Sequence, residues 1–189
     1  MNLILKKGAP ESMEGRTARE ARCYELLREL GVELARVDHP SEPADTMEAC
    51  ERIDAALGAV ICKNLFLCNR QKTDFYLLMI PAGKIFKTKD LSAQIGSARL
   101  SFASGEQMVE LLDTEPGSLS VLSLMNDKDG RVRLLVDRDL LSSEYIGCHP
   151  CVNTSSLRLS RDDIFNKIVK AVDHEPTYVT LPIYENDEK

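Results

Sequence analysis

The sequence has no surplus of positive charge and no long apolar segment. Its 24 Lys and Arg residues are outnumbered by 30 Asp and Glu residues, so that the net charge is -6. Such a chain is not held on nucleic acid mainly by bulk charge, although a local basic patch or a transient RNA substrate is compatible with it. No apolar run approaches the roughly 18 residues of a membrane-spanning helix, and residues 1–7 lack the features of a signal peptide. We therefore expect a cytoplasmic protein without a membrane or DNA partner.

Several enzyme motifs are also missing. The chain contains neither a GxGxxG fingerprint nor a Walker loop, so nothing supports a nucleotide-phosphate cradle. It has no Gly-x-Ser-x-Gly elbow of the kind that presents a nucleophilic serine. Low-complexity linkers and repeats are absent, so the length of 189 residues indicates one domain with a sizeable core.

The six cysteines are expected to be reduced thiols, because the chain is long enough to build a core without disulfides and shows no export signal. Cys148-x-x-Cys151 could in principle be a redox pair or part of a zinc site. The segment after it alternates like a strand, whereas a thioredoxin-like CxxC opens a helix. The other Cys and His spacings match no common zinc motif. Both interpretations are therefore disfavoured.

Hydrophobic periodicity and capping signals predict a mixture of helices and strands. Predicted helices span residues 18–30, 47–57, 89–95, 105–112 and 161–172. Predicted strands span residues 32–37, 59–68, 75–80, 99–103, 118–124, 131–136, 155–159 and 178–181. The first ten residues and residues 185–189 are expected to fray. Because several adjacent strands are joined by tight turns, the pattern favours an α+β fold with a mixed or antiparallel sheet.

Lys63 and Asn64 interrupt an otherwise apolar predicted strand, residues 59–68. Strand alternation places their side chains on opposite faces. A lysine in such a strand is costly to bury without an anion. Either the face of Lys63 is solvated, or the lysine meets an acidic partner, or its cation is aimed at a phosphate or a developing oxyanion.

The segment Gly147-Cys148-His149-Pro150 predicts a loop that can present backbone amides to a ligand. Glycine permits unusual backbone angles and proline makes the chain rigid. His149 could act as an acid, a base or a hydrogen-bond donor, while a structural turn with a surface histidine explains the pattern equally well. His39-Pro40 ends a predicted strand and either borders a pocket or forms a plain turn.

Several short motifs occur in the same order as in the YbaK/prolyl-tRNA-synthetase-associated editing domain family. They are residues 63–67, 100–103, 116–118, 126–127, 147–150 and 153–154. The chain resembles this family over residues 17–182, and free-standing prolyl-tRNA editing proteins are the most similar members. It departs from many members at residues 121–123, where they carry Pro-Phe-Gly. The resemblance implies one editing domain between an N-terminal segment, 1–16, and a tail, 183–189. It also implies a mixed, barrel-like sheet flanked by helices.

The same resemblance implies hydrolysis of the ester that joins a wrong amino acid, most of all alanine, to tRNA(Pro). No metal or other cofactor is expected. The partners would be the acceptor end of tRNA(Pro) and prolyl-tRNA synthetase. By this resemblance Lys63 binds phosphate or stabilises the oxyanion, Gly147 offers an amide to the carbonyl, and His149 orients substrate or water. A small pocket would accept alanine and exclude the larger proline. The predicted substrate-binding residues are His39, Asn64, Ser101, Asn126 and Pro150.

Other interpretations remain open at this point. Cysteine, serine or threonine esters are alternative substrates within the superfamily. An alternative from another class is a non-catalytic module that binds tRNA or a synthetase, or a regulator that uses the old pocket as a sensor. The presence of both Lys63 and the loop around His149 disfavours that alternative.

Overall fold

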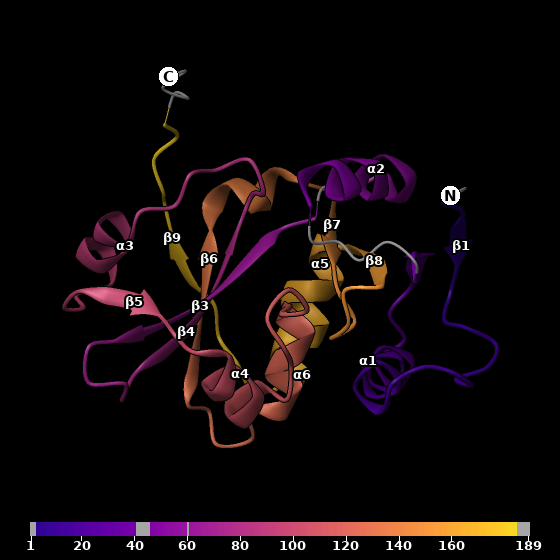
Figure 1. Ribbon diagram of the computed structural model, residues 1–189, viewed down its shortest axis with the longest axis horizontal. Coiled ribbons are helices and arrows are strands. Elements are labelled where there is room, and N and C mark those ends of the chain that lie inside the picture. Colours follow the sequence, from indigo (N-terminus) through magenta and orange to yellow (C-terminus); the bar gives the residue numbers. More distant parts are fainter. Residues whose placement is uncertain (1–2, 41–45, 60, 185–189) are drawn as a thin grey trace.

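Two β-sheets lie side by side and organise the chain (Figure 1). The computed structural model describes residues 3–40, 46–59 and 61–184. The smaller sheet is antiparallel, with the strand order β1-β2-β8-β7. Its strands are β1 Leu5–Lys7, β2 Leu34–Asp38, β7 Tyr145–Cys148 and β8 Ser155–Ser160.

The larger sheet is mixed, with the strand order β5-β3-β4-β6-β9. β3 and β4 form the predicted antiparallel hairpin, β5 pairs antiparallel with β3, and β6 and β9 extend the sheet in parallel with β4. Every residue of β4 is buried, as is typical of a strand that is covered on both faces. The strands are β3 Lys63–Asn69, β4 Phe75–Ile80, β5 Leu100–Phe102, β6 Val132–Asp137 and β9 Thr177–Val179.

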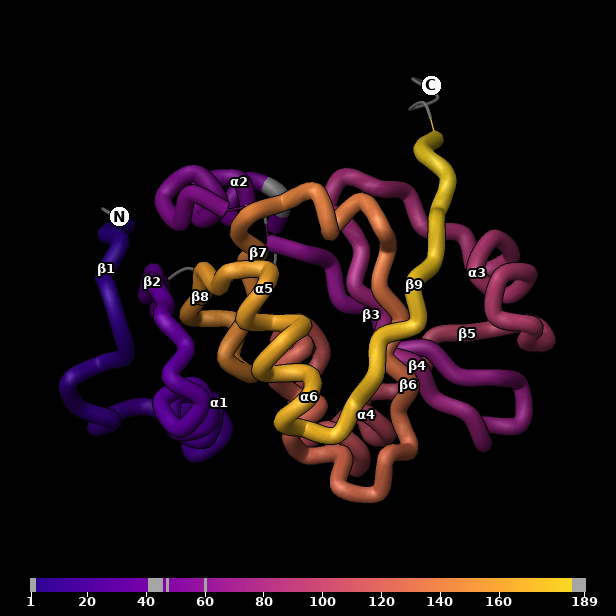
Figure 2. The backbone as a smooth tube through the Cα atoms, turned by 180° about the vertical axis from the view of Figure 1, so that it is seen from behind, coloured from indigo at the N-terminus to yellow at the C-terminus, as the bar shows by residue number. Residues whose placement is uncertain are grey.

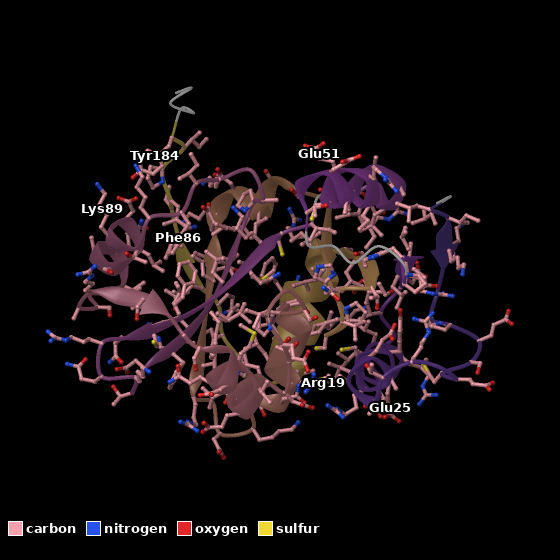
Figure 3. The ribbon with its side chains drawn as sticks, viewed as in Figure 1. Arg19, Glu25, Glu51, Phe86, Lys89 and Tyr184 are labelled. Atoms are coloured by element: carbon pink, nitrogen blue, oxygen red, sulfur yellow. The ribbon has the colours of Figure 1, made fainter. Side chains whose placement is uncertain are left out.

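Helices cover both sheets and lie at both ends of the molecule. In both views α3 lies beside β5 at one end, while α1 and β1 lie at the other (Figures 1 and 2). The exposed side chains of Glu25, Glu51 and Lys89 point outwards from α1, α2 and α3 (Figure 3). The α-helices are α1 Ala18–Glu29, α2 Met47–Leu57, α3 Thr88–Ile95, α4 Gly105–Leu112, α5 Arg161–Asp163 and α6 Val169–Ala171. The shorter turns are the 3₁₀ segments η1 Val121–Asn126 and η2 Arg138–Ser142 and the π-type turn η3 Ile164–Ile168, which joins α5 to α6. No helix within the described ranges is long and apolar enough to cross a membrane.

Local signals place most helix ends as predicted. The Thr46 side chain accepts a hydrogen bond from the backbone N–H of Ala49, and Gly58 ends α2 in a left-handed conformation. Ser104 and Gln107 form a reciprocal capping box at the start of α4. Such caps satisfy the backbone groups that a helix end leaves unpaired, so they locate the ends from short sequence windows.

The two sheets meet at a single bridge between described residues. Ile61, just before β3, pairs in parallel with Gly147 of β7, and the Cys62 N–H donates to the Gly147 carbonyl over 3.1 Å. Side chains of both sheets share one hydrophobic core, in which Phe66 of β3 and Cys62, just before β3, join Cys148 and Leu157 of the smaller sheet. The mixed α+β class is confirmed, whereas the described strands form two joined sheets rather than one barrel-like sheet.

Two predicted segments differ in the structure. Residues 118–124 were predicted as a strand, but the 3₁₀ segment η1 occupies 121–126 and the Ser120 side chain caps it. Val121 to Met125 are all buried. The continuous apolar run therefore indicates that the segment is buried on every side, and it does not indicate an extended backbone. The first ten residues were expected to fray, but β1 pairs with β2 at the edge of the smaller sheet. The strand β7 was not predicted.

Candidate active site

The junction of the two sheets brings Lys63 and Asn64 next to the Gly147 segment. β3 begins at Lys63, two residues after the bridge to Gly147. The Asn64 side chain donates to the Cys62 carbonyl over 3.1 Å, on the face of β3 that points into the shared core. Lys63 lies on the other face, with Leu65, and is exposed. The predicted separation of the two side chains onto opposite faces is therefore observed.

The Lys63 ammonium is not neutralised by a carboxylate of any described residue. Its Nζ donates to the backbone carbonyl of Lys84 over 3.1 Å. Of the three interpretations open at the sequence level, an acidic partner does not fit the described part of the chain. A solvated cation that is bound to a neutral carbonyl is available to an anionic ligand.

Gly147 is required by close packing. A Cβ atom at this position would lie 2.9 Å from Cγ1 and 3.0 Å from Cα of Ile61, closer than non-bonded atoms approach. Its φ is not in the left-handed region, so backbone strain is not the reason for glycine here. Any side chain at residue 147 would push the two sheets apart at their junction.

His149 and His39 are both buried and share one hydroxyl group. Nδ1 of His149 lies 3.1 Å from the Ser155 carbonyl and 3.4 Å from Oγ of Ser156, and Nε2 of His39 lies 3.0 Å from the same Oγ. Because a carbonyl oxygen only accepts, Nδ1 of His149 carries the hydrogen and Nε2 carries the lone pair of the neutral ring.

The pKa of His149 is lowered from 6.5 to about 4; burial is the main cause, the hydrogen bond to Ser155 opposes it, and the neighbouring His39 adds to the lowering. His149 is therefore neutral at physiological pH, and its Nε2 can accept a proton or a hydrogen bond from a hydroxyl group or water.

This pKa predicts a pH-dependent stability. Between pH 6.5 and about 4 the unfolded chain binds a proton that folded His149 does not, so the free energy of unfolding falls as the pH falls. This loss of stability is absent well above pH 6.5 and reaches about 3 kcal/mol at pH 4. Urea unfolding at pH 7 and pH 4.5 should show a smaller pH effect for His149→Gln than for the wild type. Parallel curves for the two proteins would contradict the assigned neutral state.

The remaining predicted site residues fall into two groups. Pro150 is buried directly after His149 and belongs to the junction. Ser101 lies on β5 opposite Cys68, which is five residues, or about 17 Å, along β3 from Lys63. The Asn126 side chain donates to the Leu112 carbonyl over 2.9 Å and so satisfies the end of α4. The structure does not bring Ser101 or Asn126 to the junction.

Sequence reasoning missed Lys84, Ser155 and Ser156. The two serines bind the histidine rings, and the Lys84 carbonyl binds Lys63. Ser155 and Ser156 begin a predicted strand directly after the family motif Asn153-Thr154. This position is only a weak sequence signal that the two serines belong to the site. Lys84 follows a turn at the end of β4, and its partners lie 53 and 97 residues away, so no local pattern indicates its role.

The cysteines are free thiols, as expected. Cys151 contacts Cys23 of α1, with the two sulfur atoms 3.4 Å apart, and also Oγ of Ser123 over 3.4 Å. The strand β8, and not a helix, follows the Cys148/Cys151 pair. Among the residues that the structure describes, no group of three or more His, Cys, Asp or Glu side chains could hold a metal ion.

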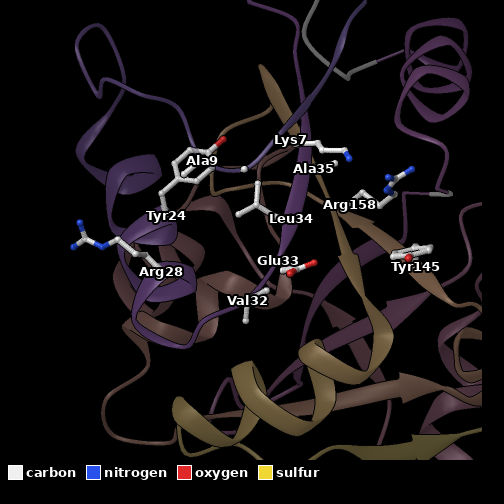
Figure 4. Close-up of a pocket in the computed structure, with 11 residues that line it drawn as sticks. Lys7, Ala9, Tyr24, Arg28, Val32, Glu33, Leu34, Ala35, Tyr145 and Arg158 are labelled. Carbon is white, nitrogen blue, oxygen red and sulfur yellow. The ribbon is translucent and has the colours of Figure 1, made fainter.

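A separate pocket of about 640 Å³ lies between α1 and the strands of the smaller sheet (Figure 4). Basic and aromatic side chains, including Lys7, Arg28, Arg158, Tyr24 and Tyr145, contribute to its lining. None of the site residues predicted from the sequence lines it. The predicted site residues that the structure brings together lie at the sheet junction and not in this pocket.

Known proteins match most of this chain. The family model of the aminoacyl-tRNA editing domain matches residues 41–166. The prolyl-tRNA editing protein ProX of Acetoanaerobium sticklandii is 32% identical over 145 residues, which cover 77% of this chain and 87% of that protein. The prolyl-tRNA synthetase associated domain-containing protein 1 of Mus musculus is 32% identical over 160 residues, covering 82% and 92% of the two chains.

A solved structure of a protein assigned provisionally as a trans-editing enzyme for prolyl tRNA synthetase shares the fold. The TM-score is 0.66 at 14% sequence identity, over 88% of this chain and 99% of that one. The motif order, the matching family model and the shared fold agree, and the chain belongs to the aminoacyl-tRNA editing domain family.

Proposed function

We propose that this protein is a metal-independent, trans-acting deacylase that hydrolyses the ester of mischarged tRNA(Pro), above all Ala-tRNA(Pro). The observation that carries the proposal is the exposed ammonium of Lys63, which meets no carboxylate of a described residue, at the same sheet junction as the neutral, buried His149. The names of two relatives, which refer to prolyl-tRNA editing and to prolyl-tRNA synthetase, support the choice of tRNA. In this proposal the partners are the acceptor end of tRNA(Pro) and prolyl-tRNA synthetase, and the location is the cytoplasm.

The proposed chemistry uses position and charge rather than a protein nucleophile. An aminoacyl ester is already activated, and a vicinal ribose hydroxyl of the substrate can assist the attack of water. Lys63 binds a phosphate of the terminal nucleotide or stabilises the oxyanion that forms on the ester carbonyl. His149 orients the substrate or water through the lone pair on Nε2. His39, Asn64 and Pro150 shape the surroundings of these two groups.

Selectivity for alanine over proline would come from size. A cavity that fits a methyl side chain excludes the larger ring of the cognate amino acid, which protects correctly charged tRNA(Pro). Because cysteine is only slightly larger than alanine, Cys-tRNA(Pro) is the substrate against which this sieve must be tested.

The direct test compares three substrates under single-turnover conditions. Purified protein is incubated with Ala-tRNA(Pro), Cys-tRNA(Pro) and Pro-tRNA(Pro), and release of each amino acid is followed with and without EDTA. We expect rapid release of alanine, little release of proline and no effect of the chelator. Preferred release of cysteine would reassign the substrate, and binding of tRNA without any release would favour the non-catalytic module. A stoichiometric metal whose removal stops turnover would contradict metal independence.

Replacement of both Cys148 and Cys151 by serine is expected to leave a substantial part of the deacylation rate. The thiols are buried, no helix begins after them, and burial raises the pKa of Cys148, so we expect the pair to pack rather than react; the pKa of Cys151 is lowered, but by its contacts with Cys23 and Ser123 inside the core. Deacylation and disulfide exchange are measured on the same preparations. Wild-type protein that reduces disulfides efficiently but releases no alanine, together with a double variant that loses this activity, would establish the redox interpretation instead.

A further inference from the structure

Lys84 is a buried lysine in the turn that follows the end of β4, an inner strand of the larger sheet. Only 7% of its surface is exposed. Its Nζ lies 2.7 Å from an oxygen of Asp137, 2.8 Å from an oxygen of Asp139 and 2.8 Å from the Leu181 carbonyl. An ammonium has three N–H donors, so these three acceptors satisfy it completely.

The charge of Lys84 is secured by these contacts. Burial alone would lower its pKa, but the hydrogen bonds and charges of Asp137 and Asp139 outweigh burial and raise the pKa. Asp137 is fully buried, and its other oxygen accepts from the Asp139 N–H over 3.0 Å. The turn 81–84 is therefore fastened to the end of β6 and to the chain after β9.

The backbone of the same residue holds Lys63. The Lys84 carbonyl accepts the hydrogen bond from Nζ of Lys63, so the anchored side chain of Lys84 fixes the acceptor that locates the Lys63 ammonium. The two carboxylates of this region, Asp137 and Asp139, are both engaged by Lys84. Neither has an ion pair with Lys63 among the described residues.

From this arrangement we propose that Lys84 is a positioning residue for Lys63. It fixes the carbonyl that orients the Lys63 ammonium, and it occupies the carboxylates that would otherwise neutralise that ammonium. The inference rests on the proposed deacylase function, in which Lys63 must offer an uncompensated charge to the substrate. Without the Lys84 side chain, the buried carboxylate of Asp137 would lack a cation. The long, exposed side chain of Lys63 is bound at the same turn, so it is the cation that would pair with Asp137 instead.

The test compares Lys84→Met, Lys84→Arg and the double variant Lys84→Met/Asp137→Asn with the wild type. Lys128→Met serves as the matched control, because Lys128 is an exposed lysine in a turn outside the junction. Two quantities are measured on each protein. The first is the rate at which acetic anhydride modifies Lys63 relative to Lys72, read from peptide masses. The second is kcat and KM for deacylation of Ala-tRNA(Pro).

We expect acetic anhydride to modify Lys63 several-fold more slowly in Lys84→Met than in the wild type, because an ammonium paired with a carboxylate reacts less readily. The same variant should lose at least tenfold in kcat/KM. Lys84→Arg keeps the cation and should keep the wild-type reactivity of Lys63. The double variant removes the buried carboxylate and should restore the reactivity of Lys63 together with part of the deacylation. A purely structural role for Lys84 would not produce this rescue.

Unchanged reactivity of Lys63 in folded Lys84→Met would overturn the positioning role, as would a double variant that is no better than the single one. Should Lys84→Met fail to fold, the double variant and Lys84→Arg decide: wild-type reactivity of Lys63 in both supports the role, and reduced reactivity in both overturns it. A wild-type protein that releases no amino acid overturns the deacylase proposal instead. In that case the rates at which Lys63 is modified in the variants still test whether Lys84 positions Lys63.

Discussion

Lys63→Ala is expected to lower the rate of alanine release from Ala-tRNA(Pro) by about 10²–10³, the usual loss when one preorganised electrostatic contact is removed from a reaction centre. Lys63 is the cation at the start of β3 whose ammonium meets a neutral carbonyl and no described carboxylate. No other cation of the Lys63 to Leu67 motif can replace it. The measurement is a single-turnover time course with enzyme in excess over Ala-tRNA(Pro).

The matched control for this experiment is Lys72→Ala, at the turn of the same β3–β4 hairpin. Lys72 is also exposed but lies at the opposite end of the hairpin from the junction. It should retain nearly the full deacylation rate, whereas Lys63→Arg should retain only part, because a guanidinium differs from an ammonium in shape and hydration. Deacylation by Lys63→Ala within threefold of the wild type, with the circular dichroism spectrum unchanged, would remove Lys63 from the mechanism.

Gly147→Ala is expected to destabilise the protein and to reduce deacylation strongly. The added Cβ atom would lie 2.9 Å from the side chain of Ile61 and 3.0 and 3.1 Å from its backbone atoms, at the bridge that joins the two sheets. Overpacking of this kind typically costs about 1–3 kcal/mol. The backbone shift that relieves it moves His149, two residues further along. Thermal unfolding and the deacylation rate are measured together.

Two further variants separate overpacking from a general effect of replacing glycine. At Gly83 the φ angle is not left-handed and nothing lies within 4 Å of an added Cβ, so Gly83→Ala should unfold at nearly the wild-type temperature. Adding Ile61→Ala to Gly147→Ala removes the side-chain contact but leaves the two backbone contacts, so the rescue should be incomplete. Wild-type stability and activity of Gly147→Ala would show that the sheets tolerate a wider separation at this point.

The elements that were predicted correctly have signals contained in short windows. The helix at residues 47–57 has its capping threonine and its terminal glycine within one residue of its ends. The hairpin of β3 and β4 follows from two apolar runs around a polar turn. The error at residues 118–124 has the same origin, because a continuous apolar run is compatible with any buried backbone and not only with a strand.

The sequence by itself determined the α+β class, most helix and strand positions, the family, and the candidate residues Lys63, Gly147 and His149. These features depend on periodicity, caps and motif order, which are read along the chain.

Tertiary structure decided the environment of those residues. The Lys63 ammonium donates to the carbonyl of Lys84, whose own side chain is held by Asp137, 53 residues further along the chain. His149 is neutral because it is buried, with a smaller effect of the neighbouring His39. His39 is held there by its hydrogen bond to Ser156, which lies 117 residues further along the chain. Ser101 and Asn126 belong to the same motif set but fold into positions away from the junction. Charge, protonation and proximity depend on which distant segments pack together, and that packing minimises free energy over the whole chain rather than within any local window.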